Sequence, residues 1–122
     1  MTLKLLVVDD SKAMRMIVKR TLRQAGFENC DVDEAENGVE ALAKIRAGSY
    51  DLVLSDWNMP ELNGIDLLEA LKAEGNATPF GFVTTESTPE MRARAREAGS
   101  LFLIAKPFTA ETFQKELGAV MA

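Results

Sequence analysis

Asp56 is the residue whose type and position point most directly to chemistry. It closely follows the apolar run at residues 52–54, and a carboxylate in such a place can act as a nucleophile that accepts a phosphoryl group. Asp9 and Asp10 follow a second apolar run, at residues 5–8. Crowded carboxylates repel one another unless a cation lies between them, so this set of three favours a divalent-ion site.

Two further polar side chains end apolar runs in the same way. Thr84 follows residues 80–83, and Lys106 follows residues 101–105. If the runs are neighbouring parallel strands, all these groups meet at one edge of one sheet. A metal, an ammonium and a hydroxyl aimed at phosphoryl oxygens would stabilise phosphoryl transfer. Mg²⁺ suits such oxygen ligands, and the backbone carbonyl of Asn58 is a further candidate ligand.

Short apolar runs alternate with helical patterns five times along the chain. The runs predict strands at residues 3–8, 31–35, 51–55, 80–84 and 101–105. Strict alternation predicts an α/β fold, a doubly wound parallel sheet with helices on both faces. Ligands of such folds bind beyond the carboxyl ends of the strands, where the polar groups named above lie.

Capping residues mark where the helices begin and end. The predicted N-caps are Ser11, Asn37, Thr88 and Thr109, and the predicted stops are Gly26, Gly48 and Gly75. The first helix is predicted to bury Met14, Ile17, Val18, Leu22 and Ala25. The fourth helix has only Met91, Ala95 and Ala98 as its apolar face, so we expect it to be lightly anchored and mobile. Phe108 and Phe113 have the spacing of a hydrophobic staple around the last helix.

The composition narrows the classes of function. The 122 residues, 47% hydrophobic and 27% charged, suit one globular domain, and no apolar stretch reaches the roughly 20 residues of a membrane helix, so we expect a cytoplasmic protein. A net charge of -5 argues against binding to nucleic acid. The absence of histidine excludes Ser-His-Asp and Cys-His mechanisms and a histidine metal site, and restricts any phosphorelay role to acceptance on a carboxylate. The single cysteine, Cys30, cannot form an internal disulfide and is taken as an ordinary strand residue.

Taken together, these residues resemble the receiver domain of two-component response regulators, most closely the stand-alone chemotaxis (CheY-like) type. The resemblance covers the whole chain, residues 1–122, with no output domain expected. It rests on Asp9-Asp10-Ser11, on the segment from Ser55 to Pro60, on Gly64, Val83-Thr84 and Glu86, and on Lys106-Pro107-Phe108. The resemblance implies a flavodoxin-like sheet of order 2-1-3-4-5 with five helices.

The resemblance also implies a role for each site residue. Asp56 would accept a phosphoryl group from a histidine kinase, with Mg²⁺ held by Asp9, Asp10, Asp56 and the backbone carbonyl of Asn58. Thr84 and Lys106 would contact the phosphoryl group, and the Lys106-Pro107 bond would be cis. Asn58 and Glu86 would tune self-dephosphorylation, which predicts a short-lived phosphoryl state. The protein would catalyse only its own phosphorylation and dephosphorylation.

Phosphorylation is expected to draw Thr84 inward and to change the surface made by the fourth helix, the fifth strand and the fifth helix, where a downstream effector would bind. Chemotaxis or motility signalling is the favoured pathway, by a monomer for which dimerisation on activation stays open. Arg92, Arg94 and Arg96 on the fourth helix indicate either an acidic partner or an ordinary solvated basic face.

Three positions depart from the family pattern. Leu103 stands where the family usually has an aromatic switch residue, and Phe102 should point to the opposite face of the strand. Thr85 is larger than the residue often found there and would crowd the space that the switch needs. The stretch before the second strand, residues 30–33, is about two residues longer than in the chemotaxis type, so a bulge or a longer loop is expected.

Other functions stay open at this point. A phosphatase with an aspartyl-phosphate intermediate would need a second acid two residues after Asp56, where Asn58 stands. A phosphorylation-independent scaffold is favoured by Leu103 and disfavoured by the intact acidic cluster. Within the receiver interpretation, the protein is either a signal to an effector or a phosphate sink that drains a kinase.

Overall fold

Within residues 2–85 and 87–121, which the computed structural model describes, five parallel strands form one sheet in the order β2-β1-β3-β4-β5. The strands are β1 (Leu3–Val8), β2 (Cys30–Ala35), β3 (Leu52–Ser55), β4 (Phe80–Thr84) and β5 (Leu103–Ala105). The helices are α1 (Lys12–Gln24), α2 (Gly38–Ala47), α3 (Gly64–Ala73), α4 (Pro89–Glu97) and α5 (Ala110–Met121). The predicted strand order and alternation are confirmed.

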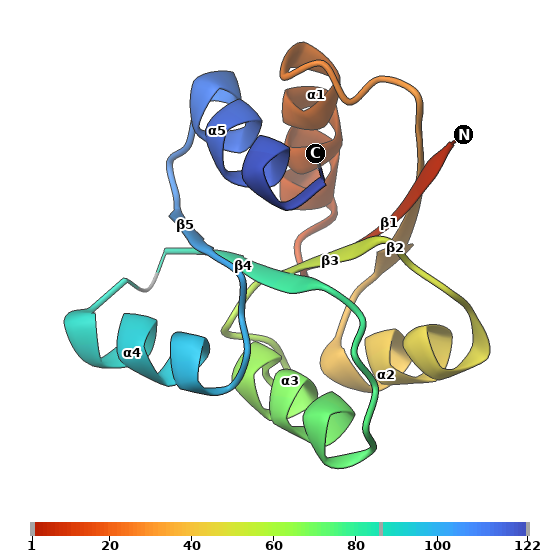
Figure 1. Cartoon of the computed structure of the whole chain (residues 1–122), viewed down its shortest axis with the longest axis vertical. Coiled ribbons are helices and arrows are strands. Elements are labelled where there is room, and N and C mark those ends of the chain that lie inside the picture. The colour runs from red at the N-terminus through yellow and green to blue at the C-terminus, as the bar shows by residue number, and fades with distance from the viewer. Residues whose placement is uncertain (1, 86, 122) are drawn as a thin grey trace.

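Helices cover both faces of the sheet. Figure 1 shows α1 and α5 on one face and α2, α3 and α4 on the other. Leu5 and Val7 of β1 pack in the cluster under α1 and α5, while Leu6 and Val8 pack in the cluster on the other side. Because both faces are buried, the central strands read as continuous apolar runs rather than alternating ones.

The β1–β2 pairing is unbroken from Leu3 opposite Cys30 to Val8 opposite Ala35. This register excludes the bulge that the sequence analysis allowed at residues 30–33, and places any extra length in the loop between α1 and β2. The second strand was predicted to begin at residue 31, one residue later than its observed start at Cys30. The third was predicted to begin one residue too early, at 51 instead of Leu52.

The last strand begins at Leu103, two residues later than predicted. Leu101 is 51% exposed, and the Ser100 hydroxyl donates to the carbonyl of Phe102 at 2.7 Å. The chain therefore bends before the regular strand begins, although the Leu101 N–H already donates to the carbonyl of Phe80 at 2.8 Å. Phe102 packs in the cluster under α1 and α5, whereas Leu103 contacts the cluster on the opposite face. The predicted opposite orientation of these two side chains is thus confirmed.

The predicted helix caps are confirmed. Ser11, Asn37 and Thr88 accept hydrogen bonds from the backbone N–H three residues later, and Thr109 accepts one from Thr112 at 3.2 Å. The rings of Phe108 and Phe113 lie 4.7 Å apart, as a hydrophobic staple requires. Gly26 has a φ of 99° after the end of α1, a conformation that costs little without a Cβ.

The predicted buried face of α1 is wrong at one residue. Ile17 is 36% exposed, and Thr21 is buried instead, between Val18 and Leu22. Thr21 tolerates burial because its hydroxyl donates to the carbonyl of Ile17 at 2.8 Å, which leaves no polar atom unpaired.

The thin apolar face of α4 is confirmed, with Ala95 as the buried residue within the helix. In the part of the chain that the structure describes, the helices are too short or too polar to cross a membrane.

Candidate phosphoryl and metal site

Three carboxylates meet at the carboxyl edge of the sheet. Asp9 and Asp10 follow β1, and Asp56 follows β3. The backbone N–H of Asp56 donates to the carbonyl of Val8 at 2.9 Å, which joins the ends of the two strands. One carboxylate oxygen from each of the three residues lies within 4.8 Å of the others. These are hard oxygen donors around one small space, a set that fits Mg²⁺.

Lys106 supplies the positive charge of the cluster. Its Nζ lies 2.9 Å from Oδ2 of Asp9 and 3.5 Å from Oδ2 of Asp56. The Lys106 side chain is 10% exposed, and its backbone N–H donates to the carbonyl of Thr84 at 2.9 Å. The Lys106-Pro107 bond is cis, as expected. Lys106 directly follows β5, so its ammonium lies beside the carboxylates that follow β1 and β3.

The Asp56 side chain is largely buried, with an exposed fraction of 12%. Burial raises the pKa of its carboxyl above the ordinary value, and the nearby Asp9 charge acts in the same direction. The Lys106 ammonium, the Trp57 N–H at 2.7 Å from Oδ1 and the Thr84 hydroxyl oppose this rise in pKa. Such an environment favours a ligand that brings more positive charge to the carboxylate.

A family comparison decides what kind of domain carries this cluster. The family described as response regulator receiver domain matches residues 5–118. The chain belongs to this family. Receiver domains of this type are signalling proteins rather than classical enzymes, they bind Mg²⁺ at an acidic pocket, and they take phosphoryl groups from histidine kinases and bind downstream targets.

Curated relatives of this receiver domain include chemotaxis proteins. Chemotaxis protein CheY1 of Helicobacter pylori is 44% identical over 122 residues, which covers 98% of this chain and 97% of that protein. Chemotaxis protein CheY-3 of Vibrio cholerae is 41% identical over 120 residues, which covers 97% of this chain and 91% of that protein.

Solved structures of receiver domains have the same fold. The structure of Vibrio cholerae chemotaxis protein CheY4 superposes with a TM-score of 0.85 and 36% identity, covering 98% of this chain and 99% of that one. The receiver domain of the Francisella response regulator 1452 superposes with a TM-score of 0.87 and 29% identity, covering 98% of this chain and 96% of that one. The flavodoxin-like prediction of the sequence analysis is confirmed.

Gly64 lets the receiver's third helix begin against the Asp56 backbone. A Cβ at this position would lie 2.2 Å from the carbonyl oxygen of Asp56 and 2.8 Å from the ring of Phe82. The Gly64 N–H donates to the carbonyl of Trp57 at 2.7 Å, and Trp57 packs on Phe82 with ring centroids 4.8 Å apart. The loop after Asp56 is therefore tightly packed, and we expect the fluorescence of Trp57 to respond to changes in this loop.

The structure also describes Asn58, Leu103 and Thr85. Asn58 is exposed in the loop after Asp56. Leu103, the first residue of β5, is half-buried. Thr85 is exposed, whereas the neighbouring Thr84 is fully buried. Glu86 lies outside the described residues.

One contact to the cluster, made by Arg15, was missed by the sequence analysis. Arg15 Nη1 donates to the backbone carbonyl of Asp9 at 2.7 Å, and its Nε donates to Glu34 at 2.8 Å. The sequence holds one usable signal: a basic residue in the first turn of the helix that begins at Lys12, just after Asp9-Asp10.

Proposed function

We propose that this receiver accepts a phosphoryl group on Asp56 from a histidine kinase, with Mg²⁺, and passes the signal to a partner protein by a change in surface. The observation that carries the proposal is the convergence of three carboxylates on one site with the Lys106 ammonium, 3.5 Å from Asp56. This combination supplies a nucleophile, a place for a cation and a fixed positive charge.

In the proposed step, a carboxylate oxygen of Asp56 attacks phosphorus while the bond from phosphorus to the kinase histidine nitrogen breaks and the nitrogen takes the electron pair. The oxygen Oδ1 accepts the Trp57 N–H, and Oδ2 faces Lys106. Bound Mg²⁺ would neutralise charge on the phosphoryl oxygens. Lys106 would do so from the other side, at the cost of its contact with Asp9, and Thr84 would bind a phosphoryl oxygen.

Loss of the phosphoryl group belongs to the same proposal. We propose that Asn58 and Glu86 tune the attack of water on the acyl phosphate, and that the phosphorylated state is short-lived. Exposure of Asn58 supports access of water to this edge of the site. An acyl phosphate on Asp56 that lasts for many hours with Mg²⁺ present would contradict this part of the proposal.

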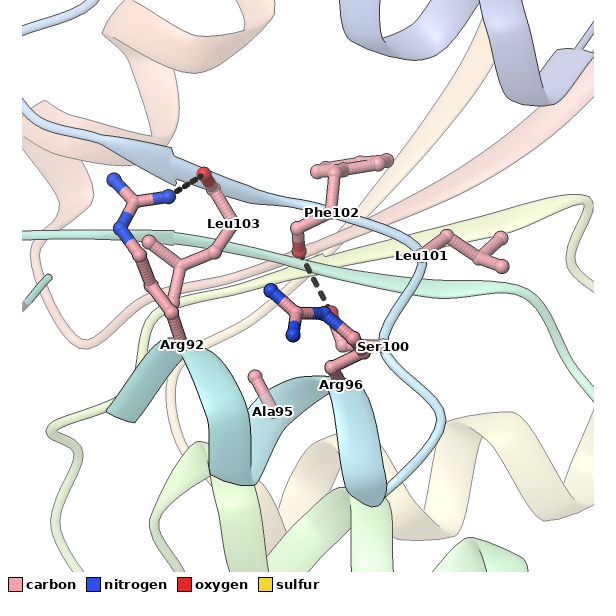
Figure 2. A pocket seen from close by; sticks show the side chains of 7 residues that line it. All are labelled: Arg92, Ala95, Arg96, Ser100, Leu101, Phe102 and Leu103. Atoms are coloured by element: carbon pink, nitrogen blue, oxygen red, sulfur yellow. Dashed lines mark hydrogen bonds between the residues drawn. The ribbon is translucent and has the colours of Figure 1, made fainter. Parts of the chain in front are cut away.

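The surface made by α4, β5 and α5 is the proposed partner surface. A groove of about 210 Å³ lies between α4 and β5, with Ala95 and Leu103 among its lining residues. Figure 2 shows Arg92 and Arg96 reaching from α4 toward β5, with the Phe102 ring turned away from α4. Two guanidinium groups beside an aliphatic wall suit a partner segment that combines acidic and apolar side chains.

Arg92 and Arg94 of α4 differ in the contacts that they make within the chain. Arg94 pairs with Glu69 at 3.3 Å, so it is already engaged with α3. Arg92 donates to the carbonyls of Ser87 and Leu103, both at 3.4 Å, and thereby bridges the loop before α4 to β5. Displacement of that loop by phosphorylation would break this bridge, so we propose that Arg92 links Thr84 to the partner surface although Leu103 is not aromatic.

Trp57 fluorescence tests the phosphoacceptor proposal, because Trp57 is the only tryptophan and adjoins Asp56. We expect an intensity change on addition of Mg²⁺ and a second change on addition of beryllofluoride or a small phosphodonor. In Asp56→Asn the second change should vanish. An unchanged signal in the wild type, with no phosphoryl adduct in the intact mass, would reject the proposal and favour a phosphorylation-independent scaffold.

A signalling role requires a downstream effector, whereas a phosphate sink drains a kinase without one. We propose chemotaxis or motility signalling, supported by the chemotaxis relatives. An effector that binds the phosphorylated receiver more tightly than the unphosphorylated one supports this role. Equal affinity in both states would favour a scaffold, and steady hydrolysis of organophosphates would favour a phosphatase.

A further inference from the structure

We propose that Arg15 is a positioning residue that fixes the peptide group between Asp9 and Asp10, so that the Asp10 carboxylate is pre-set for the cation. The inference rests on the proposed function, because it concerns the same cation site. Arg15 touches neither the proposed cation nor the phosphoryl group. It would act through the backbone of the residue before Asp10.

The position of Arg15 is set by two different hydrogen bonds. Nη1 donates to the Asp9 carbonyl at 2.7 Å, while Nε donates to Oε1 of Glu34 at 2.8 Å. The Arg15 side chain is only 12% exposed. A planar guanidinium can satisfy a carbonyl and a carboxylate at once in a fixed geometry, which a lysine ammonium on a flexible stem does less well.

Glu34 anchors this arrangement from β2. Its other carboxylate oxygen lies 3.2 Å from Nζ of Lys19, one turn further along α1. The Arg15 hydrogen bond, reinforced by Lys19, holds the pKa of Glu34 below its usual range, so the carboxylate is charged at neutral pH. Charge-assisted hydrogen bonds of this kind are roughly twice as strong as neutral ones. The α1 and β2 side chains thus form a rigid support next to the end of β1.

The backbone carbonyl is the point at which Asp9 still needs a partner. The Asp9 N–H donates to Ala35 at 3.1 Å, and its carboxylate accepts from Ser11 N–H and from Lys106, both at 2.9 Å. Arg15 completes the set. Asp9 is therefore held at every polar group, and the peptide plane that leads to the next residue is fixed with it.

Asp10 has the greatest need for such positioning. It is exposed, and its carboxylate makes no hydrogen bond or ion pair within residues 2–85 and 87–121. Its oxygen nevertheless lies within 4.8 Å of the other two carboxylates. With no side-chain partner to hold it there, the direction of the Asp10 side chain depends on its backbone. Groups that orient metal ligands from behind commonly contribute about 10- to 100-fold to metal affinity.

Electrostatics and positioning predict opposite effects of removing Arg15, which makes the proposal testable. Arg15→Gln deletes a positive charge near the cluster and leaves Glu34 with one cation fewer. Simple electrostatics then predicts tighter Mg²⁺ binding. Positioning predicts weaker binding, because the Asp9–Asp10 peptide is released.

The measurement is the dissociation constant for Mg²⁺ alone, from Trp57 fluorescence without any phosphodonor. We expect Arg15→Gln and Glu34→Gln to weaken binding about 10-fold or more, and Arg15→Lys to recover part of the loss. Arg20→Gln, at an exposed site on the same helix, carries the same change of charge and should leave binding within about twofold. Lys19→Gln loses the second Glu34 contact without touching Asp9 and should have a small effect.

The outcomes separate this inference from the function on which it rests. A wild-type protein that does not respond to Mg²⁺ would overturn the proposed function and this inference with it. A normal wild-type response with unchanged or tighter binding in Arg15→Gln would overturn the positioning role alone. Urea unfolding without Mg²⁺ accompanies each titration. If Arg15→Gln does not fold, Arg15→Lys and Glu34→Gln decide the question by the same two criteria.

Discussion

The ammonium of Lys106 lies 2.9 Å from Oδ2 of Asp9, although 97 residues separate the two in the chain. The contact is almost fully enclosed, with side-chain exposures of 10% and 6%. It joins the end of β5 to the end of β1 across two intervening strands. The positive charge of Lys106 therefore neutralises part of the negative charge of the carboxylates that a bound cation would otherwise neutralise.

Replacing Lys106 should affect stability and cation binding in opposite directions. We expect Lys106→Met to bind Mg²⁺ several-fold more tightly, because a repelling charge is gone. The same change should reduce the free energy of unfolding without Mg²⁺ by about 3 kcal/mol, since Asp9 loses its buried partner. Fluorescence titration and urea unfolding measure the two effects, with the exposed Lys115→Met as control. Weaker Mg²⁺ binding in Lys106→Met would contradict the charge-balance argument.

The hydroxyl of Thr84 is expected to serve the switch rather than the binding of the cation. Thr84 is fully buried at the end of β4, and its hydroxyl acts to lower the pKa of Asp56. Thr84→Val keeps the shape and removes the hydroxyl, so we expect Mg²⁺ affinity within about threefold of wild type. Hydrogen exchange of α4 should change on addition of beryllofluoride in the wild type and remain constant in Thr84→Val. Equal exchange responses in both proteins would exclude the hydroxyl as the link to α4.

The close packing at Gly64 predicts a large effect of a single methyl group. Gly64→Ala would place its Cβ 2.2 Å from the Asp56 carbonyl, so the loop after β3 or the start of α3 must move. We expect a loss of about 2 to 4 kcal/mol in the free energy of unfolding and a shifted Trp57 emission. Gly118→Ala is the matched control, because among the described residues no atom beyond its own helix backbone and chain neighbours lies within 4 Å of the added Cβ, and it should raise stability by about 0.5–1 kcal/mol. A Gly64→Ala protein of wild-type stability and emission would show that the loop yields without cost.

Tyr50, far from the acidic cluster at the other edge of the sheet, predicts a pH dependence of stability. Burial, together with the hydrogen bond from its hydroxyl to Asp33 at 2.8 Å, raises the pKa of Tyr50 to about 12. The unfolded tyrosine ionises near pH 10, so the folded state holds its proton longer. Stability from this group is therefore complete below about pH 10 and is lost as the pH rises toward 12.

The Tyr50 prediction is tested with the only tyrosine of the chain. We expect tyrosinate absorbance to appear near pH 12 in the wild type and closer to pH 10 in Asp33→Asn, which removes the acceptor carboxylate. The free energy of unfolding should fall between pH 10 and 11 more steeply in the wild type than in Asp33→Asn. Titration near pH 10 in the folded wild type would show that the Asp33 hydrogen bond is not kept in solution.

Local signals account for what the sequence predicted well. Apolar runs of continuous rather than alternating pattern indicate strands covered on both faces, and the N-caps act on backbone groups only three residues away. The polar residues that end the runs had to meet at one edge once the strands were parallel. The three carboxylates, Thr84 and Lys106 could therefore be gathered from the sequence alone.

Errors arose where the outcome depends on more distant partners. Ile17 and Thr21 are both compatible with the buried side of α1, and only the position of the helix on the sheet selects between them. The start of β5 depends on the Ser100 hydroxyl and on the geometry beside β4, neither of which is visible in an apolar run.

By itself, the sequence determined the elements, their order and the set of chemical groups at one edge of the sheet, because these follow from periodicity, short-range capping and strand direction. Tertiary structure alone decided which atoms touch. Arg15 and Glu34 lie 19 residues apart, and Lys106 and Asp9 lie 97 apart, so no local pattern relates them. Their hydrogen bonds exist because the helix crossing, the strand register and the sheet order together bring the side chains within about 3 Å, the range in which such bonds form.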